Sequence, residues 1–262
     1  MAEPGEIESG MVSTQPSAAR LGFWTSVLLA VVTAAAFVSG ITTPPRSGPF
    51  CTGHCITYPF TDAVQYVPRD YLWVLPGILL APTFVILACC AMACVEERRR
   101  YLSTICICFA SIATAILTID YFIQFQVVEP SLIRGEVSGL ALFTQYNPHG
   151  LFIALEDLAY LMLSAAFLFE GLSIPSASRI AKLIHWLLVL SAVLTFTTFA
   201  GMTWSFGLNI EYRFEVAIIT IVWTTLILAG ILFSFFFRKM GSRVETDARE
   251  SKHNPHRLIL SR

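Results

Sequence analysis

Acidic residues inside apolar stretches are the feature of this 262-residue sequence that most strongly suggests chemistry. Asp120, Glu156 and Asp157 each lie within a hydrophobic run that is long enough to cross a lipid bilayer. If the runs are helices that cross in opposite directions, the three carboxyl groups lie at a similar depth, roughly 8 to 10 Å below one interface. A charge at that depth costs several kcal/mol unless it is paired, hydrated or protonated, so these groups require partners or a ligand.

Other polar residues share helix faces with these acids. Glu156 and Tyr160 are four residues apart, as are Asp120 and Gln124, and this spacing places each pair on one face of a helix. His149 lies in an NPHG turn seven residues before Glu156 and is expected above the same face. The pattern predicts an outward-facing polar cavity that binds or conducts a small cation, proton or solute, with Asp120 and Glu156 as its principal groups.

The same acids also have a purely structural interpretation. In that case they pair with Arg134 or Arg213 and accept hydrogen bonds from Tyr121 or Tyr160, which locks the helices together. Acids within a membrane are functional candidates by default, yet polar residues also act as links between helices. The second functional hypothesis is therefore a non-catalytic membrane scaffold or sensor subunit with structural acids.

A CTGHC motif supplies a second cluster of reactive groups in the long segment after the first apolar run. Cys51 and Cys55 can close a small disulfide if this side of the membrane is oxidising, and we expect that bond. Free thiols are one alternative. A metal clip that includes His54 is another, although zinc sites use more ligands than this motif offers.

Enzymatic activity has little support from motifs. The sequence has no P-loop, HExxH, GxSxG or Rossmann glycine pattern. A metal-dependent enzyme that uses His54, His149 and Glu156 would need two loops to converge on one helix. We therefore assign no catalytic residue, leave any cofactor or metal unidentified, and favour a protein that is not an enzyme.

Hydrophobic composition indicates the elements that position these residues. Hydrophobic residues make up 55% of the chain and charged residues 13%, against about 25% charged in ordinary soluble domains. Runs of about 20 apolar residues without alternation predict spanning helices, and six are present. The expected fold is an all-α, polytopic six-helix transmembrane bundle, with helices at about 21–41, 71–95, 101–127, 151–172, 183–204 and 214–237.

Charge distribution predicts the orientation of this bundle. Arg98, Arg99 and Arg100 lie between the second and third runs, and Arg238 and further basic residues follow the sixth. Because cytoplasmic segments are enriched in Lys and Arg, both termini are predicted to be cytoplasmic and the two long loops to face outward, in the plasma membrane. A cleaved signal peptide is an alternative for the first run, but that run is about twice the usual length.

Three regions are expected along the chain. Residues 1–20 predict a disordered cytoplasmic tail, residues 21–238 the membrane domain, and residues 239–262 a basic, disordered cytoplasmic tail. We expect Glu170, near an inner helix end, to reach the interface and to have no role. The net charge of −1 excludes nucleic acid as a general partner, so the lipid bilayer and a small cation or solute are the partners expected; no protein partner is indicated.

Overall fold

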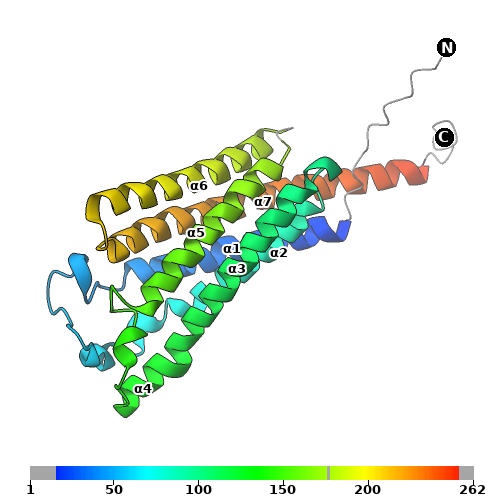
Figure 1. The fold of residues 1–262 in the computed structure, drawn as a ribbon. Helices are drawn as coiled ribbons and strands as arrows, with labels where there is room; N and C mark the ends of the chain where they lie inside the picture. Colours follow the sequence, from blue (N-terminus) through cyan, green and yellow to red (C-terminus); the bar gives the residue numbers. More distant parts are fainter. Residues whose placement is uncertain (1–15, 176–177, 254–262) are drawn as a thin grey trace.

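The residues that the computed structural model describes, 16–175 and 178–253, form helices and connecting loops, with no strand among them (Figure 1). Its helices are α1 (Pro16–Ile41), α2 (Val74–Met92), α3 (Arg100–Ile123), α4 (Glu129–Arg134), α5 (Leu151–Ser173), α6 (Arg179–Phe206) and α7 (Glu211–His253). A π-helical turn, Gln124–Val128, connects α3 to α4. Six segments are long and apolar enough to cross a membrane, which confirms the predicted six-helix transmembrane bundle.

The helix boundaries depart from the predicted ones at several ends. The first helix begins at Pro16, inside the stretch predicted as a disordered tail, while residues 1–15 lie outside the described part of the chain. The third span continues through the π-helical turn and α4 to Arg134 instead of ending near residue 127.

The last helix also extends beyond its predicted end. α7 continues to His253, so much of the predicted disordered tail 239–262 is helical, and residues 254–262 lie outside the described residues. The added stretch contains Glu, Ala, Arg and Lys, which have good helix propensity. Extending an existing helix also avoids the cost of nucleation, so a polar segment can continue an apolar span.

The long helices form a ring with one helix outside it. α1 packs on α2 and α7, α3 packs on α2 and α5, and α5 also contacts α7, while α6 covers the outer side of α5 and α7. The start of α1 and the end of α7 lie at one end of the bundle, here called the terminal end (Figure 1). The loops 42–73 and 135–150 lie at the opposite, loop end (Figure 1).

Small residues let neighbouring helices approach closely. A Cβ atom on Gly230 of α7 would lie 2.7 Å from the backbone oxygen of Ser26 in α1. A Cβ on Gly171 of α5 would lie 3.1 Å from the backbone oxygen of His185 in α6, whose Nδ1 is 2.7 Å from the Gly171 oxygen. Close packing of this kind drives helix association in a membrane. Lipid tails are as apolar as the side chains, so the hydrophobic effect contributes little to that association.

Candidate functional site

A chain of buried hydrogen bonds crosses the bundle from α7 through α5 to α3. Trp223 Nε1 donates to the Tyr160 hydroxyl at 2.7 Å, and the hydroxyls of Tyr160 and Tyr121 are 2.8 Å apart. Tyr121 donates to Oε1 of Glu156, so its single proton is used and Tyr160 must donate to Tyr121. All four side chains are at most 1% exposed. Three donors in series therefore end on the Glu156 carboxyl group.

A second glutamate faces Glu156 from α7. The carboxyl group of Glu215, which is 8% exposed, lies close enough to that of Glu156 for the two groups to share a proton. Within the described residues, Oε2 of each glutamate has no hydrogen-bond partner. Asp120 of α3 and Asp157 of α5 are near enough to repel a charge on Glu215. This acidic cluster thus combines three helices at one level of the bundle.

A cavity of about 410 Å³ lies next to this cluster at the loop end. Glu215 lines it, together with residues from the end of α1, the following loop and the start of α7. At its rim Ile41, Phe50 and Val216 are exposed, so the cavity opens at the surface between α1 and α7. Aromatic rings form much of its wall: Phe37, Phe50, Trp73, Tyr146, Phe152, Tyr212 and Trp223.

Three aromatic residues of the cavity wall, Trp73, Tyr212 and Trp223, donate their hydrogen bonds to other residues of the protein. Trp73 Nε1 donates to Oε1 of Gln145 at 3.3 Å, and the Tyr212 hydroxyl donates to the Gln145 backbone oxygen at 2.9 Å. The indole N–H of Trp223 is bound to Tyr160, as described above. Since these donors are occupied, the three residues offer the cavity ring surface rather than hydrogen bonds.

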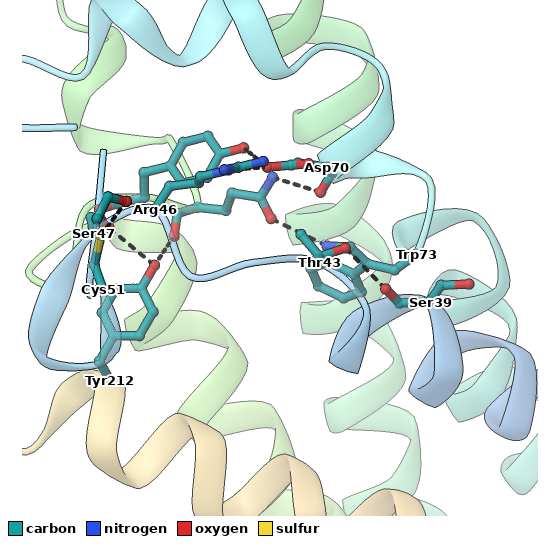
Figure 2. Close-up of polar contacts among 11 residues, drawn as sticks. Ser39, Thr43, Arg46, Ser47, Cys51, Asp70, Trp73 and Tyr212 are labelled. Atoms are coloured by element: carbon teal, nitrogen blue, oxygen red, sulfur yellow. Dashed lines mark hydrogen bonds and ion pairs between the residues drawn. The ribbon is translucent and has the colours of Figure 1, made fainter. Parts of the chain in front are cut away.

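A polar network in the loops holds this wall in place. Figure 2 shows Arg46 and Asp70 paired, with Arg46 Nε 2.9 Å from Asp70 Oδ2. Gln145 Nε2 donates to the Asp70 backbone oxygen at 3.1 Å, and the Tyr146 hydroxyl donates to Asp70 Oδ2 at 3.4 Å. The hydrogen bond to Asp70 raises the pKa of the Arg46 guanidinium, whereas burial raises the pKa of Tyr146. The positive charge in the cavity wall is therefore permanent and already balanced by Asp70.

The structure brings together some of the residues that the sequence predicts as a site. Glu156 and Tyr160 belong to one hydrogen-bonded chain, and Asp120, 2% exposed, lies near Glu156. None of these three lines the cavity, although Asp120 and Glu156 were expected to be its principal groups. Glu215 takes that position because α7 inserts between α1 and α5 at this level.

Gln124 and His149 have other surroundings. Gln124 lies in the π-helical turn, and its Nε2 donates to the backbone oxygen of Phe143 at 2.9 Å, which anchors the loop 135–150. His149 is exposed and is not part of the cavity wall. Its backbone N–H donates to Oδ1 of Asn147 at 3.0 Å within the turn. The predicted polar site therefore does not include the side chains of Gln124 and His149.

Three residues of the site were given no such role from the sequence. The sequence indicates Tyr121 only as a structural partner of the acids, and Glu215 is not among the residues that it predicts for the site. Trp223 carried a signal, because it is a tryptophan in the middle of an apolar run. Tryptophan prefers the membrane interface, so a central one indicates a buried partner for its N–H.

The CTGHC motif forms a separate surface feature. Cys51 and Cys55 are joined by a disulfide, with 5.9 Å between their Cα atoms, and His54 is exposed between them. No group of three or more His, Cys, Asp or Glu side chains in the described residues is arranged to hold a metal. The hypothesis of a metal enzyme that uses His54, His149 and Glu156 therefore has no structural support.

Comparison with known proteins gives no relative for this arrangement. No family model, no curated protein and no solved structure matches the chain.

Proposed function

We propose that this multi-pass membrane protein binds a small organic cation in the loop-end cavity, with Glu215 as the counter-charge and Glu156 behind it. The observation that carries this proposal is a buried carboxyl group in a wall of aromatic rings. Aromatic faces attract ammonium groups, most strongly where water is excluded, and a carboxylate adds a direct charge interaction. The cavity volume also lies within the range of about 300 to 1,000 Å³ that is usual for small-molecule sites.

Other ligand classes fit these walls less well. An anion would find Arg46 already paired with Asp70, and it would find the donors of Trp73, Trp223 and Tyr212 occupied. An inorganic cation needs several converging oxygen, nitrogen or sulfur ligands, and the described residues provide no such group. An organic cation needs only one acid and apolar surface, which this cavity supplies.

The orientation of the bundle is part of the proposal. Arg98, Arg99 and Arg100 lie between α2 and α3 at the terminal end, where Arg238 and Lys239 of α7 also lie. The positive-inside rule then places this end in the cytoplasm and opens the cavity to the outside, in the plasma membrane. The Cys51–Cys55 disulfide at the loop end suits an oxidising exterior.

A scaffold or sensor role is the second candidate. The bond from Tyr121 to Glu156 joins α3 to α5, which is what a structural acid would do. In that case the acids hold the bundle together, and the loops or the basic segment of α7 bind a protein partner. The two candidates differ in what happens when an organic cation is added.

Thermal unfolding of the purified protein in detergent tests the proposal. The probes are benzyltrimethylammonium, the net-neutral N,N-dimethylbenzylamine N-oxide of similar shape, and benzenesulfonate. A ligand that binds only the folded state raises its stability by RT ln(1 + [L]/Kd). We expect the cation alone to raise the unfolding temperature, and the increase to disappear in Glu215→Gln.

Variant controls separate binding from folding. Thr220 also lines the cavity but has no charge, and its hydroxyl bonds the backbone of its own helix at Val216, so Thr220→Val should keep the response to the cation. Equal stabilisation by all three probes, or an undiminished response in Glu215→Gln, would contradict cation binding at this site and favour the scaffold role.

A further inference from the structure

We propose that cation binding at Glu215 releases the proton that Glu156 and Glu215 share, so that the cavity exchanges a proton for an organic cation. This inference rests on the proposed function and adds a coupled ion to it. It follows from the way the two carboxyl groups face each other between α5 and α7.

Two adjacent carboxyl groups in an apolar interior cannot both be ionised without a nearby positive charge. Repulsion and the loss of hydration together favour the state in which the pair holds a single proton, as in the carboxyl pairs of aspartic proteases. Glu156 is completely buried and Glu215 nearly so, and Oε2 of each has no hydrogen-bond partner in the part of the chain that is described. The empty site therefore has one negative charge and one proton.

The hydrogen bonds indicate which glutamate holds the proton. Glu156 accepts from Tyr121, which is itself polarised by donation from Tyr160 and Trp223. A chain of donors stabilises the charged form of the carboxyl group on which it ends. The proton is thus left on Glu215, which is the glutamate in the cavity wall.

The charged groups around the pair do not remove the need for this proton. Asp120 on α3 and Asp157 on α5 add repulsion to Glu215. Arg213, two residues before Glu215 on α7, donates to the Asn209 backbone oxygen at 3.4 Å and lies over the ring of Phe206.

The groups that face the two glutamates from the cavity side also provide no free positive charge. Tyr212 of α7 is a neutral donor that bonds the Gln145 backbone, and Arg46 in the loop is bonded to Asp70. A ligand ammonium is thus the positive charge that the site can accept without breaking an existing pair.

The exchange balances in charge and atoms. The ammonium enters beside Glu215, the O–H bond of the Glu215 carboxyl breaks, and the proton passes through the open cavity to water at the loop end. No covalent bond to the ligand forms, and the net charge of the occupied cavity is the same before and after. Because a proton leaves with each cation bound, the affinity should rise about tenfold per pH unit while the pair is protonated.

Proton release can be measured directly with the full-length protein in weakly buffered detergent solution. Benzyltrimethylammonium is the probe, a pH-indicator dye reports released protons, and calorimetry in two buffers of different ionisation enthalpy gives the number of protons per bound cation. We expect about one proton per cation and an affinity that rises with pH. An infrared band of a protonated carboxyl group should disappear when the probe is added.

Two variants sharpen this test. In Glu156→Gln the amide donates to Glu215, which becomes ionised, so we expect binding without proton release. Glu170→Gln alters a buried acid far along α5 and should behave like the unchanged protein. If Glu156→Gln does not fold, the infrared measurement on the unchanged protein still decides the question.

The outcomes separate this inference from the proposed function. Binding of the cation with no proton release, a constant affinity across pH and an unchanged infrared band would overturn proton exchange and leave cation binding intact. Absence of binding at every pH would overturn both.

Discussion

Glu156 and Glu170 lie fourteen residues apart on α5, and both are completely buried. Glu156 accepts a hydrogen bond from Tyr121 and faces Glu215, which lines a cavity of about 410 Å³. Glu170 lies beside the thiol of Cys106 on α3, and no tyrosine or second acid is described next to it. Two residues of the same type on one helix thus have different surroundings.

The cavities at the two ends differ in the same way. The one near the terminal end has a volume of about 180 Å³ and is lined by Cys94 and residues of the α5–α6 connection and α7, but not by Glu170. An acid within the membrane therefore becomes a candidate binding group only where other helices add donors, a second acid and a route to the surface. Without these, burial alone is uninformative about function.

The largest expected difference between the two sites comes from introducing a lysine at Glu215, beside Glu156, and at Glu170. In Glu215→Lys the new ammonium can pair with Glu156, so the protein should fold with nearly unchanged stability and fail to bind benzyltrimethylammonium. In Glu170→Lys a buried ammonium has no acid to pair with and should cost at least about 3 kcal/mol. Unfolding temperatures in detergent compare the variants, and equal destabilisation would show that the two sites do not differ as described.

A second test concerns the helices that frame the cavity. Gly230→Leu should destabilise the protein by about 1 to 3 kcal/mol, because a side chain there meets the backbone of Ser26 and Ala30 in α1. Since α1 and α7 both line the cavity, the Gly230→Leu variant should also bind the cation with lower affinity. The control is Gly201→Leu, because a Cβ at Gly201 meets no atom within 4 Å. Similar behaviour of the two variants would count against the close contact of α1 and α7.

A smaller effect should follow from removing the polar side-chain group that lies beside each acid. Tyr121→Phe takes away the hydroxyl that binds Glu156 and should cost about 1 to 3 kcal/mol, because a buried acceptor is left without its partner. Both oxygens of Glu170 already lack a hydrogen-bond partner among the described residues, so Cys106→Ala leaves no further acceptor unpaired and should cost less. Chemical or thermal unfolding of both variants measures the difference, and a larger loss in Cys106→Ala would reverse the proposed ranking of the two sites.

The smallest expected effect concerns thiol reactivity at the terminal end. Burial raises the pKa of the Cys94 thiol to about 12, so only a small fraction is thiolate at pH 8. Alkylation by iodoacetamide, followed by mass spectrometry of peptides, should be slow and should still be accelerating between pH 8 and 10, since the thiolate reacts. A rate that levels off by about pH 10, as expected for a thiol of ordinary pKa, would show that this end is open to water.

Sequence reasoning was sufficient for features that depend on one segment at a time. The apolar runs predicted six spans, because a segment in hydrocarbon must form all of its backbone hydrogen bonds within its own helix. The four-residue spacing of Glu156 and Tyr160 placed them on one face, and the hydrogen-bonded chain contains both. These features follow from helical geometry alone.

Features that depend on contacts between segments could not be read in this way. The meeting of Glu215 with Glu156 requires the order and rotation of α5 and α7, which no spacing in the sequence determines. Gln124 turns toward Phe143 because of the fold of the loop 135–150. Glu170 was expected to reach the interface but is completely buried. Although it lies in the last turn of α5, it faces Cys106 of α3 inside the bundle.

Labelling with dicyclohexylcarbodiimide tests the central claim most directly, because this reagent modifies protonated carboxyl groups in apolar surroundings. The modified residues are identified by peptide mass spectrometry, with and without benzyltrimethylammonium. The account predicts that Glu215 is modified, that the cation protects it, and that any modification of Glu170 is unaffected by the cation. Modification of Glu215 that is equal with and without the cation, or protection of Glu170 instead, would contradict the account.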